Sequence, residues 1–264
     1  EAIKAATASR RARVIALDKI DEIPYDFERR RLTVIVRHPD GSHEMITKGA
    51  IEETLAVCTA ERAGESSRPL VPARRETIQV LCGERLAAGY RMLAVASRRI
   101  ESRVGCELAD ERDLCLEGFL LFEDPPKPDV GVVISDLKRL GVRLKIVTGD
   151  HALVARHAAA AVGLDDSRTL TGRELEGLDE AELRQRVWDI DLFAQIEPDQ
   201  KERIVHALRA SGHVVGYLGD GINDAPSLRA ADVGISVDGA VDVARESADF
   251  VLLSHDLDVL RRGV

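Results

Sequence analysis

The eight residues Gly219–Pro226, GDGINDAP, follow the apolar stretch His213–Leu218 and carry the strongest chemical signal in this sequence. The glycines on either side of Asp220 allow a tight turn and a close approach of the backbone to a ligand. Asp220 and Asp224 are four residues apart, so one helical turn can aim both carboxylates the same way. Converging carboxylates repel unless a cation neutralises them, and such oxygen ligands suit Mg²⁺. The pattern favours a Mg²⁺ site; a polar turn with an aspartate helix cap is the alternative.

Thr148-Gly149-Asp150 follows the apolar stretch Arg143–Val147 and opens a predicted helix. A hydroxyl group and the free backbone N–H groups of a helix N-terminus together make a seat for a phosphate group. The alternative is an ordinary helix cap formed by the threonine or the aspartate. We favour the phosphate seat because the Asp220–Asp224 pair lies in the same part of the chain.

Lys201 lies in the first turn of the helix that we expect after Pro198. The helix dipole disfavours a cation there, so the placement of the lysine needs another explanation. A lysine acts well as a point charge on a phosphoryl oxygen. A solvated lysine remains the alternative.

Two motifs in the first half of the chain suit a nucleotide. Lys48-Gly49-Ala50 follows a predicted strand and opens a helix, and Phe27, with Tyr25 close by, lies in the charged segment Asp26–Arg31. An aromatic ring flanked by charges can stack on a nucleobase, with arginines such as Arg29 near the phosphates. The alternative is a ring that points into the core from a strand edge. Arg91, which opens another predicted strand, has the same ambiguity.

The elements that must position these residues change in kind at Glu123–Pro128, EDPPKP, where closely spaced prolines favour a hinge over the interior of a helix or strand. The part before this boundary reads as an α+β unit. Its expected elements are a hairpin of Arg31–Arg37 and His43–Lys48, a helix over Val71–Tyr90, a strand over Arg91–Ile100, and polar loops over Glu61–Pro69 and Glu101–Asp113.

Beyond the boundary short strands and helices alternate, which predicts a parallel sheet with helices on both faces. Ligands of such sheets bind beyond the carboxyl ends of the strands, where the motifs above fall. The expected helices are Val130–Leu140, Asp150–Val162, Glu180–Val187, Pro198–Ala210 and one near Asn223–Ala230, and the expected strands are Arg143–Val147, Leu192–Gln195, His213–Leu218, Val233–Ser236 and Phe250–Leu253.

Composition excludes several classes of protein. The 264 residues are 45% hydrophobic, enough for a sizeable core. The formal charge is −9 (37 Lys and Arg against 46 Asp and Glu), and no basic run is longer than Arg29–Arg31, so we expect no nucleic-acid partner. The 4 cysteines form no C-x-x-C pair, which argues against a zinc cage. No stretch is long and apolar enough for a membrane helix.

Taken together, five motifs resemble the cytoplasmic catalytic part of a P-type cation-transporting ATPase. They are KGA at 48–50, DPPK at 124–127, TGD at 148–150, the lysine of PDQK at 198–201, and GDGINDAP at 219–226. The segments Ile20–Arg31 and Ser236–Asp249 look most like the bacterial magnesium-transporting branch of that family.

The resemblance implies an α/β protein with two domains. Residues 1–118 would be an N-terminally truncated nucleotide-binding domain with an antiparallel sheet, and 119–127 a hinge. Residues 128–264 would be a phosphorylation domain of the haloacid-dehalogenase type, a doubly wound parallel sheet that lacks the strand of the nucleophile.

The resemblance also implies roles for single residues, with ATP and Mg²⁺ as cofactors. Phe27, or less favourably Tyr25, would stack on adenine in a pocket lined by Lys48 and Gly49. Arg29 and Arg91 would lie near the phosphates of the nucleotide, and Asp124 would lie at the hinge. The phosphoryl site would comprise Thr148, Gly149, Asp150 and Lys201, with Asp220 as Mg²⁺ ligand and Asp224 and Asn223 beside it.

One departure from the family is large: the nucleophile motif D-K-T-G-T is absent from this sequence, and Asp18–Asp21, DKID, does not match it. Arg30 also stands where many relatives carry a lysine. We therefore expect a piece of a longer pump that couples ATP hydrolysis, through an aspartyl-phosphate, to cation transport. Magnesium is the suggested ion, and the piece would lie on the cytoplasmic side of a bacterial plasma membrane, with the transport helices outside it and no capacity to phosphorylate itself. The alternatives are a soluble dehalogenase-type phosphohydrolase and a non-catalytic nucleotide-binding module.

Overall fold

The computed structural model of this chain describes residues 17–101, 105–127, 129–253 and 257–263. These residues form two compact units. The first extends to Arg85 and resumes over Met92–Phe122, whereas the second takes in Leu86–Arg91 and the chain from Glu123 onward. Within the described ranges, no helix has both the length and the hydrophobicity that crossing a membrane requires.

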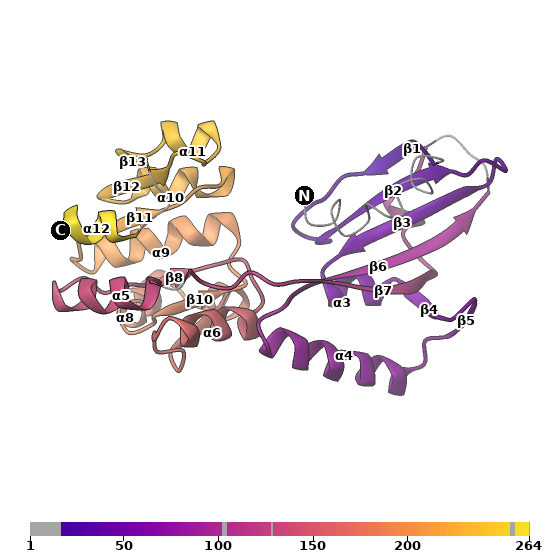
Figure 1. The fold of residues 1–264 in the computed structure, drawn as a ribbon, viewed down its shortest axis with the longest axis horizontal. Helices are drawn as coiled ribbons and strands as arrows, with labels where there is room; N and C mark the ends of the chain where they lie inside the picture. Colours follow the sequence, from indigo (N-terminus) through magenta and orange to yellow (C-terminus); the bar gives the residue numbers. More distant parts are fainter. Residues whose placement is uncertain (1–16, 102–104, 128, 254–256, 264) are drawn as a thin grey trace. The chain divides into compact units, whose positions relative to one another are not determined.

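The first unit is built on a seven-stranded sheet with the strand order β1-β2-β3-β6-β7-β4-β5 (Figure 1). The pairs β1–β2, β2–β3, β3–β6 and β4–β5 are antiparallel, and β4–β7 is parallel. The strands are β1 Asp18–Ile23, β2 Arg31–Arg37, β3 His43–Gly49, β4 Cys58–Ala63, β5 Ser66–Pro69, β6 Arg91–Ile100 and β7 Leu114–Phe122.

The predicted hairpin of β2 and β3 is confirmed, with Arg31 opposite Gly49 and Arg37 opposite His43. The prediction of a polar loop over Glu61–Pro69 was wrong, because these residues form most of the hairpin of β4 and β5. The sequence concealed it since all four residues of β5 are exposed at the edge of the sheet, where no apolar alternation is needed. Strands β1 and β7 were also missed.

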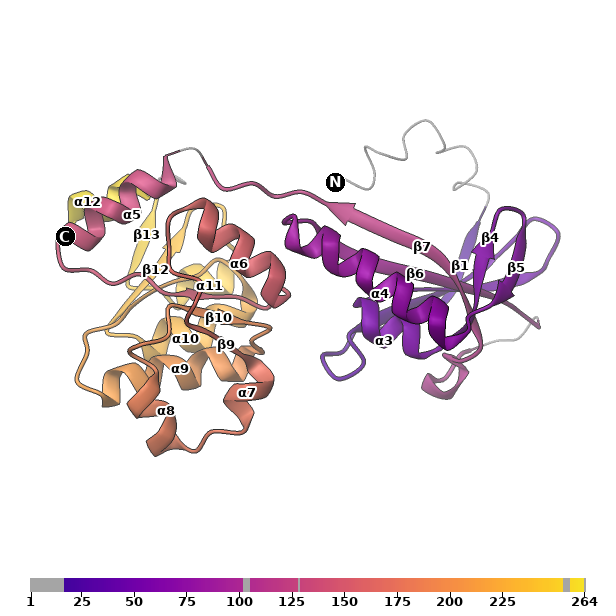
Figure 2. The same ribbon diagram turned by 90° about the horizontal axis from the view of Figure 1, so that it is seen from below.

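Two helices, α3 Ile51–Ala56 and α4 Pro72–Ala87, lie on one face of this sheet (Figures 1 and 2). Met45, Ala94 and Ala96 of the strands pack there against Leu55 of α3 and Ile78 of α4. A short 3₁₀ helix, η2 Leu108–Asp110, precedes β7. The alternate residues of each strand, among them Lys48, lie on the opposite face of the sheet.

The second unit alternates strands and helices, as the sequence predicted. Its strands form two three-stranded parallel sheets, in the orders β8-β10-β9 and β11-β12-β13. The strands are β8 Ile146–Val147, β9 Thr169–Thr171, β10 Leu192–Ala194, β11 Gly216–Leu218, β12 Val233–Val237 and β13 Phe250–Leu252. The helices are α5 Val130–Arg139, α6 Ala152–Ala161, α7 Gly172–Glu176, α8 Glu180–Arg186, α9 Pro198–Ala210, the 3₁₀ helix η3 Ile222–Asp224, α10 Ala225–Ala230, α11 Asp242–Glu246 and α12 Asp258–Gly263.

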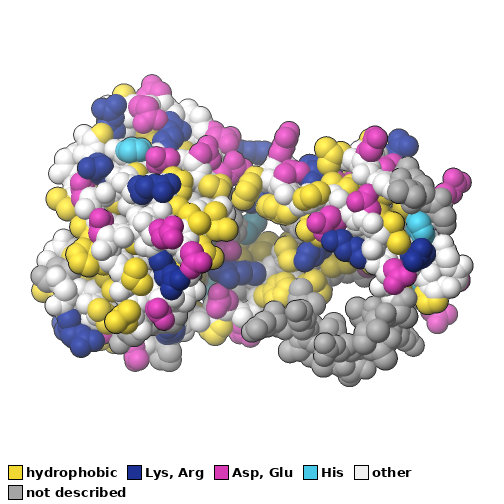
Figure 3. Space-filling view, turned by 90° about the horizontal axis from the view of Figure 1, so that it is seen from above, with side chains coloured by type: hydrophobic (Ala, Val, Ile, Leu, Met, Phe, Trp, Pro, Cys, Tyr) yellow, Lys and Arg dark blue, Asp and Glu magenta, His cyan; other side chains and the backbone are white. Residues whose placement is uncertain are grey.

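The parallel pairing is confirmed, but the single doubly wound sheet is not seen among the described residues. Among the strands that the structure describes, β8 pairs only with β10, and β11 pairs only with β12. The strands predicted over Arg143–Val147 and His213–Leu218 are also shorter than expected. On the face shown in Figure 3, acidic and basic side chains are interspersed without a broad area of one sign.

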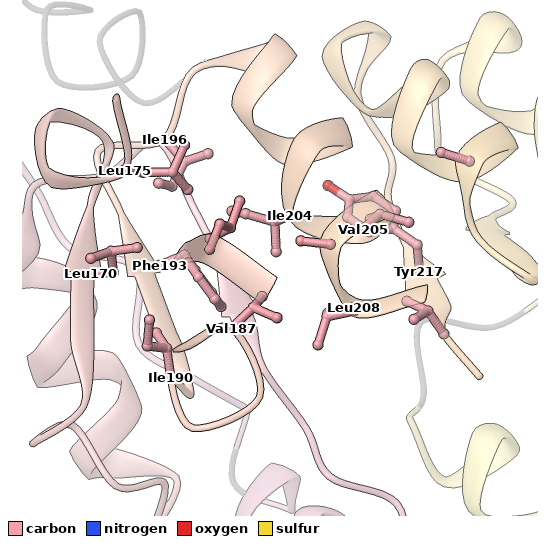
Figure 4. Packing of buried hydrophobic residues seen from close by; sticks show 14 of the residues in the cluster. Leu170, Leu175, Val187, Ile190, Phe193, Ile196, Ile204, Val205, Leu208 and Tyr217 are labelled. Atoms are coloured by element: carbon pink, nitrogen blue, oxygen red, sulfur yellow. The ribbon is translucent and has the colours of Figure 1, made fainter. Parts of the chain in front are cut away.

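The core of the second unit lies between β10 and helix α9. Phe193 and Ile204 are almost fully buried in it, and Tyr217 of β11 packs into the same cluster (Figure 4). Helix α9 contributes Ile204, Val205 and Leu208 because residues three and four apart share one helical face. This packing fixes α9 against β11, and hence the helix that carries Lys201 against the strand that ends in the GDGINDAP motif.

Replacing Phe193 by alanine should lower the free energy of unfolding of this unit by about 3–5 kcal/mol, because it removes a fully buried ring. Trp188, the only tryptophan, stacks on His213 at 3.8 Å between ring centroids and reports on this unit by its fluorescence during denaturant unfolding. Phe250→Ala is the matched control, since that ring is 62% exposed and should cost less than about 0.5 kcal/mol. Equal losses for both variants would contradict this description of the core.

Candidate functional site

The carboxyl ends of β8 and β10 lie at one edge of their sheet. The two strands are parallel, with Val147 opposite Phe193. The Thr148 N–H donates to the carbonyl of Phe193 at 2.9 Å, and the Ile196 N–H donates to the carbonyl of Thr148 at 3.0 Å. The Thr148–Asp150 motif is therefore held at a strand end, as the sequence predicted.

The turn after β8 does not form the helix cap by Thr148 or Asp150 that the sequence left as the alternative. The Asp150 N–H donates to the Thr148 hydroxyl at 3.1 Å, and helix α6 begins only at Ala152. The cap is His151, whose Nδ1 accepts the N–H of Leu153 at 3.2 Å. Neither Thr148 nor Asp150 caps the helix, so both side chains lie ahead of it, on the turn.

Asp224 lies at the centre of a hydrogen-bonded cluster in the second unit and is only 7% exposed. Its Oδ1 accepts Lys201 Nζ at 2.7 Å and the Tyr217 hydroxyl at 2.9 Å, and its Oδ2 accepts the Gly221 N–H at 3.0 Å. Burial by itself raises the pKa of Asp224, but the hydrogen bond and charge of Lys201, together with the other two donors, outweigh it and hold the pKa below its ordinary value. Burial also raises the pKa of Tyr217, which keeps its hydroxyl a donor.

Gly219 is required for this cluster. A Cβ atom on Gly219 would lie 2.5 Å from Cβ of Asp224, so a larger residue would push the carboxylate away. The expected helical turn from Asp220 to Asp224 is found only in part, because the 3₁₀ helix η3 covers Ile222–Asp224 and Asp220 lies ahead of it. Asp220 and Asn223 are exposed, and Asp224 is buried. The two carboxylates therefore have different surroundings.

The two carboxylates of the predicted Mg²⁺ site differ in whether they need a cation. The need for a cation beside Asp224 is met by Lys201, whereas the exposed Asp220 carboxylate accepts no hydrogen bond from any described residue. No cluster of three or more His, Cys, Asp or Glu side chains suited to a metal occurs in the described part of the chain. Mg²⁺ keeps several waters and binds through one or two carboxylates together with phosphate oxygens. Asp220 fits that manner of binding, and Asp224 fits a supporting position.

Arg91, Asp124 and Asp150 are brought together in the second unit. Arg91 donates from Nη1 to Asp124 Oδ2 at 2.9 Å and from Nη2 to Asp150 Oδ2 at 2.8 Å. The three side chains are between 29% and 66% exposed, so the pairs add little stability. An arginine held in this way can exchange its carboxylate partners for a phosphate oxygen at small cost.

The aromatic pair of the first unit lies on the loop between β1 and β2. Tyr25 and Phe27 are each 48% exposed, and their rings meet edge to face with centroids 5.5 Å apart. The sequence left open whether Phe27 points into the core, and the structure places it at the surface. Lys48 of β3 is exposed and lies opposite Leu32 of β2.

The loop and the Lys48-Gly49-Ala50 motif are joined directly. The Ala50 N–H donates to the carbonyl of Arg30 at 2.9 Å. A Cβ atom on Gly49 would lie 2.4 Å from Cβ of Arg31 and 2.6 Å from the Arg30 carbonyl oxygen. Glycine is thus needed at position 49 because the backbone after Phe27 passes directly over it.

The Arg29 side chain, predicted to lie near the phosphates, is bonded to other residues of the first unit. Its Nη1 donates to both oxygens of Glu111 at 2.8 and 2.7 Å, its Nη2 donates to the carbonyl of Pro24 at 2.7 Å, and its Nε pairs with Asp26. Glu111 also accepts Arg31 Nε at 2.7 Å and the Thr33 hydroxyl at 2.6 Å. Burial raises the pKa of Glu111, but these donors outweigh it and leave the pKa below 4.5.

Sequence reasoning missed Tyr217 and Glu111. A tyrosine in the otherwise apolar stretch His213–Leu218 was a signal, since a buried hydroxyl needs a partner. Glu111 gave no local signal, because it lies in the polar segment Glu101–Asp113 and meets its arginines across about 80 residues of chain.

Comparison with known proteins confirms the resemblance to P-type ATPases. Residues 6–129 match the family model described as "P-type ATPase, cytoplasmic domain N". The chain is 47% identical over 247 residues to "Magnesium-transporting ATPase, P-type 1" of Escherichia coli K12, covering 93% of this chain and 28% of that protein. The chain is 46% identical to the protein of that name in Salmonella typhimurium 14028s, over 93% of this chain and 27% of the relative. "Probable cation-transporting ATPase F" of Mycobacterium bovis is 33% identical over 94% of this chain and 28% of its own length. The chain thus spans little more than a quarter of these relatives.

Tyr217→Phe should destabilise the second unit by about 1–2 kcal/mol, because the buried Asp224 carboxylate loses one donor while the ring packing is kept. Trp188 fluorescence during denaturant unfolding measures the loss. In an Asp224→Ala background the same substitution should cost less than about 0.5 kcal/mol, since the partner is gone. Equal costs in the two backgrounds would show that the hydroxyl acts elsewhere.

The stability of the first unit should fall in acid in part through Glu111. Its folded-state pKa lies below 4.5, so its contribution is complete above pH 4.5 and is lost as the pH falls through the folded-state value. Hydrogen exchange of the β2 and β3 amides should therefore show a shallower acid loss for Glu111→Gln than for the parent chain. Glu65→Gln, an exposed change on the β4–β5 turn, should leave the pH dependence as it is. A Glu111→Gln profile parallel to the parent's would contradict the assignment.

Proposed function

We propose that this chain, with its similarity to P-type cation-transporting ATPases over 93% of its length, is the ATP-binding and phosphoryl-transfer part of such a pump. The observation that carries the proposal is the Lys201–Asp224–Tyr217 cluster next to the exposed Asp220 at the end of β11. It offers a fixed positive charge and an exposed carboxylate at a strand end, where phosphoryl-transfer sites of parallel sheets lie. Residues 1–118 would be the nucleotide-binding domain, 119–127 the hinge and 128–264 the phosphorylation domain.

The second unit would be a phosphorylation domain of the haloacid-dehalogenase type, completed by a strand from outside this chain. Strands β8 and β11 each have one edge without a partner strand among the described residues. Leu218 of β11 is 42% exposed and Val214 is 86% exposed, so apolar surface is available for a further strand. That strand would carry the nucleophilic aspartate of D-K-T-G-T, which this sequence lacks.

In the first unit the nucleotide would bind beside the loop between β1 and β2. The exposed Phe27 ring would stack on adenine, with Tyr25 supporting it edge to face. Lys48, exposed on β3 and joined to the loop through Ala50 and Arg30, would line the same pocket, and Gly49 would let the loop pass. Arg29 would act by holding the loop rather than by touching phosphate.

In the second unit Thr148, Gly149 and Lys201 would hold the transferred phosphoryl group, with Asp150 and Asn223 at the rim. Asp220 would hold Mg²⁺, which when bound offsets charge on the phosphoryl oxygens. The γ-phosphoryl group of ATP would pass to the external aspartate with ADP as leaving group, and water would later release phosphate. Arg91 and Asp124 would serve the hinge, where Arg91 could turn from its carboxylates to a phosphate oxygen.

The names of the relatives support magnesium as the transported ion. The matched family model, described as a cytoplasmic domain, and the bacterial source of the relatives support the cytoplasmic side of a bacterial membrane as the location. The residues that select the ion would lie in helices of the longer protein. ATP-Mg²⁺ would be the partner of the part described here.

Phe27→Ala should weaken ATP binding by this chain about tenfold, since base–aromatic stacking contributes about 1–3 kcal/mol. Titration calorimetry measures the affinity. Tyr25→Ala should weaken binding less, because in this arrangement its ring supports Phe27 from the edge. A larger effect of Tyr25→Ala would move the stacking role to that ring, and no effect of either change would contradict the nucleotide site.

The pump itself is tested in the longer protein that we propose, reconstituted in lipid vesicles. ATP should drive Mg²⁺ across the membrane, and Asp220→Ala and Lys201→Ala should each abolish transport. Phe250→Ala, an exposed change in the same unit, is the control. ATP hydrolysis without any ion movement would contradict the pump and favour the phosphohydrolase alternative.

A further inference from the structure

Glu111 is the most deeply buried carboxylate among the ion pairs that the described residues of the first unit form. Its side chain is 0% exposed, and it lies just after η2, far in the sequence from the residues that it contacts. It accepts two hydrogen bonds from Arg29, one from Arg31 and one from Thr33. Thr33 in turn shares a hydrogen bond with Thr47 of β3 at 2.8 Å. The carboxylate thus ties the start of β2 to β3 and to the segment before β7.

Arg29 connects Glu111 to the loop that holds the Tyr25–Phe27 pair. Beyond its bonds to Glu111, its side chain bonds Asp26 and the Pro24 carbonyl, and its own N–H donates to Asp26 Oδ1 at 2.6 Å. The Arg30 N–H donates to the Asp26 carbonyl at 2.9 Å. Phe27 therefore lies within a turn that Arg29 closes, because the Arg29 guanidinium group after the ring bonds Asp26 and Pro24 before it.

The loop needs such an anchor for two physical reasons. Arg30 has φ +49°, a left-handed conformation that costs energy for a residue with a side chain and persists only where the surroundings hold it. The aromatic rings are half exposed, so burial of the rings cannot fix the loop. The buried ion pairs supply the missing constraint, because a carboxylate without its arginines would be very unfavourable in that place.

We propose that Glu111 is a positioning residue of the nucleotide site: through Arg29 it holds the Tyr25–Phe27 pair in the geometry that receives a nucleobase. The inference rests on the proposed function for its ligand, and on the Glu111 contacts for its mechanism. A ring held in place before binding avoids the ordering cost of a mobile loop, so Glu111 contributes to affinity without touching the nucleotide.

The first unit offers a matched control. Glu61 of β4 is also a buried glutamate, 5% exposed, and accepts Arg68 Nε at 2.8 Å and Arg74 Nε at 2.9 Å. These partners lie on β5 and α4, away from the loop between β1 and β2. Glu61→Gln therefore disturbs a buried carboxylate–arginine cluster of the same kind without disturbing the anchor of Phe27.

The experiment uses the whole chain and two measurements on Glu111→Gln, Glu61→Gln and the parent. Hydrogen exchange of the Arg29 and Arg30 amides reports on the loop without any ligand, and calorimetry with ATP reports on the site. For Glu111→Gln we expect exchange of these amides to become about tenfold faster and ATP affinity about tenfold lower. Glu61→Gln should change neither by more than about twofold. Should Glu111→Gln fail to fold, Thr33→Val, which removes one donor to the same carboxylate, gives a smaller effect of the same sign.

The outcomes separate the two claims. Unchanged exchange of the loop amides in Glu111→Gln overturns the anchor, whatever the nucleotide does. Faster exchange with unchanged ATP affinity overturns the positioning role, and so do equal affinity losses in Glu111→Gln and Glu61→Gln. If the parent chain itself binds no ATP, the proposed function fails and the positioning role fails with it, while the exchange data still decide whether Glu111 holds the loop.

Discussion

A carboxylate withdrawn from water must be neutralised by donors of its own, and this constraint organises both candidate sites. In the second unit the buried carboxylate is Asp224, which draws Lys201 from α9, Tyr217 from β11 and the Gly221 N–H into one cluster. In the first unit it is Glu111, which draws Arg29 and Arg31 toward the start of β2. In each case a charged group that the sequence offers as a ligand contact, Lys201 or Arg29, is bonded to a buried carboxylate.

Each candidate site therefore combines a charged side chain that a carboxylate holds in place with side chains that are exposed. Lys201 and Arg29 are held by carboxylates, whereas Asp220, Lys48 and the Phe27 ring are left exposed beside them. In phosphoryl transfer the protein contributes mainly positioning and electrostatic stabilisation. Side chains that are fixed before the substrate binds suit this reaction. The glycines at 49 and 219 serve the same end, since each lets a backbone or carboxylate approach where a Cβ atom would collide.

The sequence predicted those features that depend on local pattern. The β2–β3 hairpin and α9 over Pro198–Ala210 agree with it, because alternation, turn residues and an initial proline are local signals. The polar hairpin of β4 and β5 was missed, since an exposed edge strand needs no apolar pattern. The division of the second unit's strands into two sheets also could not be predicted from periodicity, because it depends on which strands pair. The motif residues were found by type and spacing, but the Glu111 and Tyr217 contacts join residues that only the fold brings together.

The most direct test of the central claim is acid-stable incorporation of the γ-phosphate of ATP. We predict that the longer protein containing this chain and a D-K-T-G-T segment forms an acid-stable phosphoenzyme in the presence of Mg²⁺, and that this chain alone forms none. The phosphate should be released by hydroxylamine, as expected of an aspartyl-phosphate. Acid-stable phosphate on the isolated chain, or its absence from the longer protein, would contradict the account.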